Sequence, residues 1–311
     1  MKRSTFHATI SHIFRGPWML SEDAAIPGMQ KPYYPERSHT SEELQGYTWV
    51  SKNSNGKGPS GNVYLDMITL DTASRRFAAR SQAIQLANSA PGYQNMKGFC
   101  GVMGMAFGSR NPIKPEPQPT TFENIMGKLT EKLFTVNMRH LKDGTLEFGH
   151  IDKNAYTGDI GYSDVLNGEG YWNFTIGGLT SDKESAERKT EYVIADTASA
   201  LVMLPMQYNT AYYGQITDAL YSDEHGGFVF PCANQVPDFT FEVGGVELTI
   251  PGVFMKTSTF DDDPNLCFGG LQSSGDLGFN IIGGIAFKSA FVAFDPINAK
   301  IGWAKKTLPE Q

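Results

Sequence analysis

The chain has 311 residues, of which 40% are hydrophobic, and a formal net charge of −7. This length and composition are sufficient for one large all-β unit or for two lobes with buried cores. The negative charge balance excludes the cationic surface that a nucleic acid requires, and the longest apolar runs are far shorter than the ~20 residues of a membrane helix, so we expect neither a nucleic-acid partner nor a membrane.

The amino terminus comes first in chain order. Its first ten residues include basic side chains but no apolar stretch of the length that a secretory signal requires. Taken literally, this start predicts a cytoplasmic protein.

Short β-branched and aromatic runs fill most of the chain. They are separated by many of the 33 glycines and 17 prolines, which is typical of an antiparallel all-β protein. Residues 61–70 and 238–243 are clear examples of predicted strands. Residues 71–74 spell Asp-Thr-Ala-Ser but are followed by two arginines, so we interpret them as a hairpin turn.

Two helices interrupt the predicted strands. Residues 121–133 place their apolar side chains on one face, and Thr120 with Glu123 forms a capping box at the start. The second predicted helix covers residues 206–220 and begins behind Pro205.

Residues 192–205 carry the clearest chemical signal. Here a single carboxylate, Asp196, stands between two apolar stretches. Burying a charge at such a place costs several kcal/mol unless hydrogen-bond donors surround it, so either a turn or a functional site is indicated.

Cysteines and histidines give no sign of a metal. Cys100, Cys232 and Cys267 allow one bridge and one free thiol, and none has metal-ligand spacing. The six histidines are scattered along the chain. We therefore predict no metal and no cofactor.

Residues 192–205 resemble the carboxyl-terminal catalytic loop of pepsin-like aspartic peptidases. The resemblance implies that Asp196 is the catalytic acid, that Thr197 ties two catalytic loops together, and that the hydroxyl of Ser199 hydrogen-bonds the carboxylate. Ala198 stands where the family has glycine.

The resemblance to the fungal branch of this family continues from about Pro17 to the end of the chain. The matching segments are Gly101–Phe107, Phe148–Lys153, Gly226–Cys232, Pro237–Phe241, Cys267–Gln272, Gly278–Gly283 and Ile301–Trp303. It implies a disulfide between Cys232 and Cys267, which contributes roughly 3 to 4 kcal/mol in an oxidising compartment.

The family resemblance also implies an all-β, two-lobed fold with a cleft between the lobes. We expect an amino-terminal lobe over residues 1–165 and a carboxyl-terminal lobe over residues 166–311 that carries Asp196. Only ten residues precede Ser11, so we expect the amino-terminal lobe to be truncated. A secreted protein whose signal and prosegment were lost from the gene model is the alternative to a cytoplasmic one.

The first catalytic loop departs from the family pattern. In the family, the first catalytic Asp-Thr-Gly precedes an apolar-Trp-apolar segment. Residues 17–19 match this segment, and counting back from it places Ser11 where the first catalytic aspartate belongs. Asn53 replaces the flap tyrosine, and Cys100 and Gly284 each replace a family aspartate. Aspartic peptidases need two carboxylates that share one proton, so these changes argue against proteolysis.

Three functions follow from this pattern. The first is a peptidase homologue with impaired catalysis, whose cleft between the lobes still binds a peptide or a small apolar ligand. The second is an active aspartic-type endopeptidase with a mis-assigned amino terminus. The third is a non-proteolytic accessory enzyme in a fungal biosynthetic pathway, with Asp196 as a lone acid or base.

Overall fold

The computed structural model describes residues 8–11, 17–21, 24, 32–51, 58–71, 76–91, 101–179 and 189–308. The chain divides into two compact units, and each consists of two segments of the chain. The first unit contains Met1–Leu129 and Asn167–Tyr171, and the second contains Thr130–Leu166 and Trp172–Gln311. In the described residues, no helix has the length and apolar character to cross a membrane.

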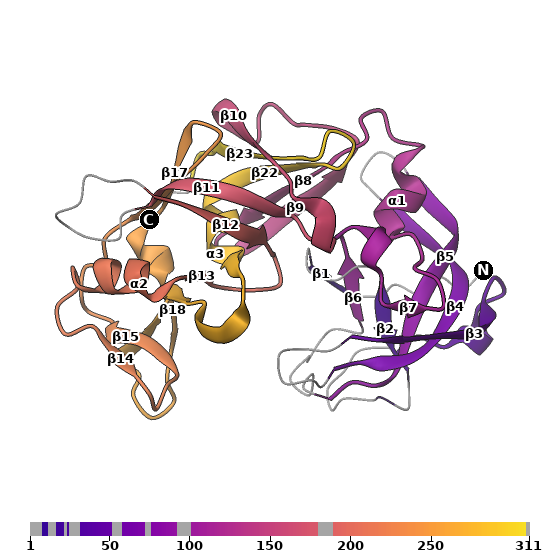
Figure 1. The fold of residues 1–311 in the computed structure, drawn as a ribbon, viewed down its shortest axis with the longest axis horizontal. Coiled ribbons are helices and arrows are strands. Elements are labelled where there is room, and N and C mark those ends of the chain that lie inside the picture. Colours follow the sequence, from indigo (N-terminus) through magenta and orange to yellow (C-terminus); the bar gives the residue numbers. More distant parts are fainter. Residues whose placement is uncertain are drawn as a thin grey trace. The chain divides into compact units, whose positions relative to one another are not determined.

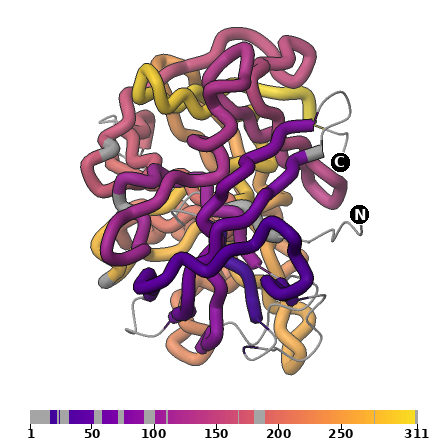
Figure 2. The backbone as a smooth tube through the Cα atoms, turned by 90° about the vertical axis from the view of Figure 1, so that its right-hand side faces the viewer, coloured from indigo at the N-terminus to yellow at the C-terminus, as the bar shows by residue number. Residues whose placement is uncertain are grey.

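A mixed sheet forms the first unit, and its described strands follow the order β1-β6-β2-β5-β4-β3-β7. Their bounds are β1 Ala8–Ser11, β2 Trp18–Leu20, β3 Glu42–Val50, β4 Ser60–Asp71, β5 Arg76–Ser89, β6 Gly101–Gly104 and β7 Ile113–Lys114. The long strands β4 and β5 run antiparallel, side by side (Figures 1 and 2). Their pairing extends to Asp71 and Arg76. Of the predicted turn at residues 71–74, Asp71 is therefore the last residue of β4, and residues 72–74 lie outside the described residues.

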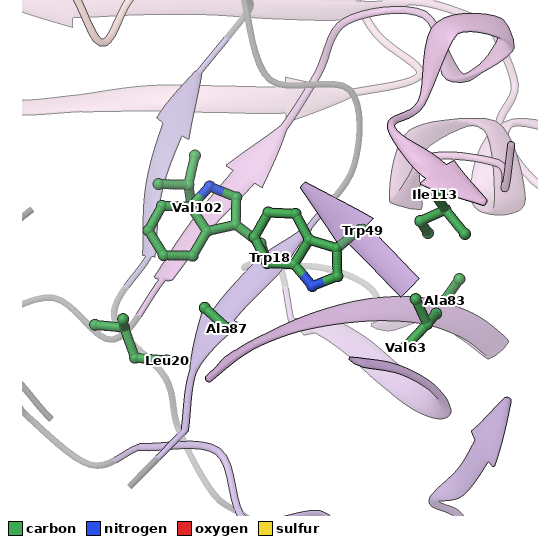
Figure 3. Close-up of a cluster of buried hydrophobic side chains, with 8 residues drawn as sticks. All are labelled: Trp18, Leu20, Trp49, Val63, Ala83, Ala87, Val102 and Ile113. Carbon is green, nitrogen blue, oxygen red and sulfur yellow. The ribbon is translucent and has the colours of Figure 1, made fainter. Parts of the chain in front are cut away.

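Two tryptophans lie at the centre of the first unit's core (Figure 3). The rings of Trp18 and Trp49 are 6.2 Å apart and inclined by 37°. Both are almost fully buried, and the indole N–H of Trp49 donates a hydrogen bond to the carbonyl of Leu86 at 3.2 Å. The aliphatic residues around them are Leu20, Val63, Ala83, Ala87, Val102 and Ile113. This cluster joins β2, β3, β4 and β5 and thereby stabilises the sheet. Strand β1, whose last residue is Ser11, belongs to the same sheet.

The second unit contains further sheets, which Figure 1 shows around α3. One has the order β10-β23-β22-β8-β9, with β8 Phe134–Arg139, β9 Lys142–Phe148, β10 Thr157–Asp164, β22 Ala290–Asp295 and β23 Lys300–Lys305. Another has the order β17-β16-β11-β12-β21-β13-β20, with β11 Asn173–Leu179, β12 Lys189–Ala195, β13 Val202–Leu204, β16 Phe239–Val243, β17 Val246–Ile250, β20 Leu271–Ser273 and β21 Asn280–Ile282. A smaller sheet has the order β14-β15-β19-β18, with β14 Leu220–Ser222, β15 Gly227–Pro231, β18 Lys256–Thr259 and β19 Leu266–Gly269.

Stacked aromatic rings form the core of the second unit. Phe134 and Phe294 stack with ring centroids 4.6 Å apart, and Trp172 packs edge-on against both rings. Phe174 stacks on Trp303 at 5.8 Å. Buried aromatic side chains bring a large apolar area to a core, so these contacts hold the sheets of the unit together.

Both predicted helices begin where the sequence indicates and end earlier. Helix α1 spans Thr121–Met126 with the predicted capping box, and α2 spans Met206–Tyr213. The residues that follow them are Gly127 and Gly214, and glycine is a poor helix former. A third helix, α3 Gly284–Ser289, is too short for its periodicity to be visible in the sequence. The 3₁₀ turns are η1 Pro35–Arg37, η2 Gly108–Arg110, η3 Asn167–Glu169, η4 Gly252–Met255 and η5 Gly275–Leu277.

The observed division of the chain differs from the predicted boundary between residues 165 and 166. Residues 130–166 belong to the second unit. The reason is their strand pairing, because β8 pairs with β22 and β10 pairs with β23. These partners lie near the carboxyl terminus, so the boundary depends on contacts between distant parts of the chain.

Candidate catalytic loop

Asp196 follows the buried end of β12 directly. Val193, Ile194 and Ala195 are buried there, and β12 runs parallel to β21 with Ala195 opposite Ile282. The backbone N–H of Asp196 donates to the carbonyl of Ile282 at 3.1 Å, and only 2% of Asp196 is exposed. The predicted acid is therefore a buried residue in a loop that two parallel strands position.

Donors from the loop itself surround the carboxylate of Asp196. Its Oδ1 accepts a hydrogen bond from the backbone N–H of Ala198 at 3.1 Å. Its Oδ2 accepts from the backbone N–H and from the hydroxyl of Ser199, at 2.9 and 2.6 Å. Hydrogen bonds of this kind offset the cost of removing a carboxylate from water.

The replacement of the family's glycine by Ala198 leaves the loop unstrained. Ala198 is exposed, and its backbone is not among the described residues with a left-handed conformation. A methyl group is therefore compatible with the turn. Thr197 is half-buried, and its part in tying two catalytic loops together stays a prediction.

The start of α3 contacts the loop through the backbone N–H groups of Gly284 and Ile285. Gly284 N–H donates to the carbonyl of Ser199 at 2.6 Å, and Ile285 N–H donates to the carbonyl of Ala200 at 3.0 Å. A Cβ atom at Gly283 would lie 2.1 Å from the carbonyl oxygen of Leu201, so only glycine fits there. Sequence reasoning missed this contact, although two glycines directly after an apolar strand were its visible signal.

The strands of the first unit repeat the arrangement around Asp196. In the second unit, β12 runs parallel and β13 antiparallel to β21, and β13 runs parallel to β20. In the first unit, β1 runs parallel and β2 antiparallel to β6, and β2 runs parallel to β5. Each unit therefore has the same four strands in the same relative directions.

The register within this repeat relates Ser11 to Asp196. Ser11 pairs with Gly104, and Asp196 comes directly after the pair of Ala195 with Ile282, which places it opposite Gly283. Trp18 follows Ser11 by seven positions and pairs with Val102. Met203 follows Asp196 by the same interval and pairs with Ile281. The backbone of Ser11 thus holds the place in its sheet that Asp196 holds in the other sheet.

Another buried carboxylate in the described residues, Asp66, is 5% exposed and lies on β4. It accepts hydrogen bonds from the hydroxyls of Tyr33 at 2.7 Å, Ser38 at 3.0 Å and Thr40, and from the N–H of Met67 at 2.7 Å. Burial and this carboxylate both raise the pKa of Tyr33. Because its oxygens are occupied by the segment from Tyr33 to Thr40, we assign Asp66 a structural role.

The other predicted positions have different outcomes. Cys232 and Cys267 form the disulfide, within the second unit. Asn53 and Cys100 lie outside the described residues. A Cβ atom at Gly284 would be 3.4 Å from the nearest atom, the carbonyl oxygen of Ser199, which is an ordinary van der Waals contact, so the backbone at this position has room for a Cβ atom.

The geometry around Asp196 is suited to acid–base chemistry. A buried carboxylate that is fixed by its own loop can donate or accept a proton without moving. The backbone N–H of Ala198 and the hydroxyl of Ser199 set the orientation of this carboxylate.

Comparison with known proteins places the chain in a family. A model of the eukaryotic aspartyl protease family matches residues 18–306. Aspergillopepsin-1 of Aspergillus clavatus is 36% identical over 292 residues, which cover 94% of this chain and 72% of the relative. Penicillopepsin-2 of Penicillium janthinellum is 35% identical over 288 residues, which cover 92% and 72%.

A solved structure shows the same fold. The aspartic proteinase from Irpex lacteus matches with a TM-score of 0.75 at 17% identity, over 98% of this chain and 91% of that chain. The predicted all-β, two-lobed pepsin-like fold is thereby confirmed. Together with the sequence matches to fungal pepsin-like enzymes, it follows that the chain belongs to the eukaryotic aspartyl protease family.

Proposed function

We propose that this chain is a pepsin-like aspartic peptidase homologue whose hydrolysis of peptides is impaired and which still binds an extended peptide or a small apolar molecule. One observation carries the proposal. The strand register gives Ser11 the place in its sheet that Asp196 has in the other, and serine supplies no carboxylate there.

The chemistry explains why this replacement matters. In an aspartic peptidase, two carboxylates share one proton, so that one activates water while the other protonates the scissile group. The hydroxyl of a serine does not ionise between pH 3 and 7 and cannot take either part. Losing one positioned acid or base removes roughly 10²- to 10⁴-fold in rate.

The first test is cleavage of a quenched fluorescent peptide library by the purified chain between pH 3 and 7. We expect little or no cleavage from a folded sample. Asp196→Asn and a pepstatin-type transition-state mimic are the controls. Cleavage that both controls abolish would overturn the proposal and favour the active endopeptidase.

A repair variant gives the second test. We expect Ser11→Asp, combined with His12→Thr and Ile13→Gly, to raise the cleavage rate by ~10²-fold or more over the unaltered chain. Adding Asp196→Asn to this variant should remove the gain. A folded repair variant without any gain would show that position 11 is not the one that limits hydrolysis.

Binding is measured separately from hydrolysis. We expect the pepstatin-type mimic, a peptide-like apolar ligand, to raise the melting temperature of the unaltered chain because it binds only the folded state. A melting temperature that stays constant up to millimolar mimic would contradict retained peptide binding.

The disulfide supports a secreted protein over a cytoplasmic one. Disulfides form and persist in oxidising compartments, and the bond joins Cys232 to Cys267. We therefore propose that the chain matures in the secretory pathway. Mass spectrometry of the chain from its natural source, after alkylation without reduction, should find both cysteines unlabelled. Two alkylated thiols would instead support the cytoplasm.

A further inference from the structure

A cavity of about 390 Å³, lined mostly by polar and charged residues, lies in the second unit, away from Asp196 in the sequence. Its walls come from the β8–β9 hairpin, the turn at residues 152–157, the end of α3 and residues 306–308. This volume is within the range of small-molecule sites in proteins. None of its walls carries a residue that the acid–base chemistry of Asp196 uses.

Cationic side chains outnumber carboxylates in the lining. Arg139, Lys142, Lys288 and Lys306 face two carboxylates, those of Glu147 and Asp152. The cavity therefore has a local excess of positive charge in a chain whose net charge is −7. Low-dielectric walls around like charges concentrate their field and attract oppositely charged molecules.

Three of these cations are available to a ligand. Within the described part of the chain, Arg139, Lys142 and Lys288 have no carboxylate within 4.0 Å. One of the two nearby carboxylates, that of Asp152, already accepts hydrogen bonds from the backbone and side-chain amides of Asn154 at 2.9 and 3.1 Å.

The fourth cation is built into the wall. The Nζ of Lys306 donates to Asn137 Oδ1 and to the carbonyl of Phe287, both at 3.1 Å, and to the carbonyl of Met138. These three acceptors match the three N–H bonds of an ammonium group. Burial and the charge of Arg139 work in the opposite direction and lower the pKa of Lys306 to about 7. A bound anion would favour the ammonium form of Lys306 and so raise this pKa again.

His140 gives the cavity a rigid side. Its ring stacks on Phe254 with centroids 4.2 Å apart, which fixes its orientation. Burial and the charge of Lys288 lower the pKa of His140. Burial is the larger of these two causes, and the ammonium group of Lys288 adds to it.

We propose that this cavity binds a small multivalent oxyanion, namely a phosphorylated or polycarboxylated molecule, with Arg139, Lys142 and Lys288 as its charged contacts. Arginine and lysine are the side chains that hydrogen-bond phosphate and carboxylate oxygens with the aid of charge. The limited volume favours a small molecule over a nucleic acid, in agreement with the chain's overall negative charge.

Thermal shift and calorimetric titration of the full chain test this proposal. The probes are inorganic phosphate, glycerol phosphate and citrate at pH 7, with chloride adjusted so that ionic strength is constant. We expect at least one probe to stabilise the chain in a saturable manner. Stabilisation by the two phosphates alone indicates a phosphorylated ligand, and stabilisation by citrate alone indicates a polycarboxylate.

Matched charge variants locate the binding. We expect Arg139→Gln and Lys288→Gln each to weaken the binding by ~10-fold, since each removes a charge-assisted contact. Lys305→Gln is the control, because Lys305 is an exposed cation on the same sheet that does not line the cavity. No saturable binding of any probe up to 10 mM, or equal weakening by the control, would overturn the proposal.

Discussion

Ser199 determines how the buried carboxylate of Asp196 is held, because it supplies both a backbone and a hydroxyl donor to one oxygen. We predict that Ser199→Ala lowers the free energy of unfolding by about 1–3 kcal/mol, since the buried carboxylate loses one donor. Urea denaturation measures the change. Ser199→Thr retains the hydroxyl and should lose much less. Identical midpoints for Ser199→Ala and the unaltered chain would contradict this account of the loop.

A second residue-scale prediction concerns Tyr208, whose hydroxyl donates to Glu191 at 2.8 Å. Burial and the hydrogen bond to Glu191 raise the pKa of Tyr208 to about 12 from its ordinary value of 10.0. The folded state therefore keeps the proton longer than the unfolded state does. This contribution to stability is complete below pH 10 and is lost as the pH rises to about 12.

The variant Tyr208→Phe isolates this effect. We expect the stability difference between the unaltered chain and Tyr208→Phe to shrink as the pH is raised from 9 to 12, in urea titrations at a series of pH values. A difference that does not vary with pH would show that the hydroxyl is equally acidic in the folded and unfolded states.

At the residue scale, the sequence predicted only part of the loop around Asp196. The family resemblance implied the hydrogen bond from the Ser199 hydroxyl to Asp196, which the structure shows. The backbone donors of Ala198 and Ser199 were not predicted, although they lie within three positions of the carboxylate. The contact between Ser199 and Gly284 was missed, because two consecutive glycines indicate a close backbone approach but not which loop approaches them.

Helix α1 shows at the element scale how one side chain joins several segments. The carboxylate of Glu123 closes the capping box by accepting from Thr120 N–H at 2.8 Å, and it also accepts from Gly108 N–H at 3.0 Å. We predict that Glu123→Ala destabilises the first unit by about 2–3 kcal/mol, because two backbone donors lose their acceptor.

Thr120→Ala is the matched comparison for this element. It removes only the cap and should cost about 1 kcal/mol. Chemical denaturation followed by tryptophan fluorescence measures both variants, since Trp18 and Trp49 are buried in the first unit. An equal cost for the two substitutions would show that the bond to Gly108 contributes nothing.

The ends of elements were the least predictable part of the fold. Leu129 and Leu133 continue the apolar periodicity of α1, yet they are buried from turns that follow the helix. The apolar periodicity indicated which side chains are buried, and a side chain can be buried from a helix or from the irregular segment that follows it. The starts were predicted correctly because Thr120 and Pro205 act locally, through a cap and a fixed backbone angle.

At the scale of the whole molecule, the disulfide acts on one unit. Cys232 and Cys267 close a loop of 35 residues in the second unit. We predict that Cys232→Ser with Cys267→Ser lowers the stability of that unit by about 3–4 kcal/mol and leaves the first unit unchanged. Calorimetry should show one transition shifted to lower temperature and another unmoved. A shift of both transitions would show that the units unfold together.

The strand repeat has a consequence for how this protein can be studied. One polypeptide contains two copies of the same four-strand arrangement, one ending in a carboxylate and the other in a hydroxyl. Both copies experience the same temperature and solvent, so one copy serves as an internal control for the other. Amide hydrogen exchange at β6 and β21, recorded in a single experiment, would compare the strand that pairs with Ser11 and the strand beside Asp196.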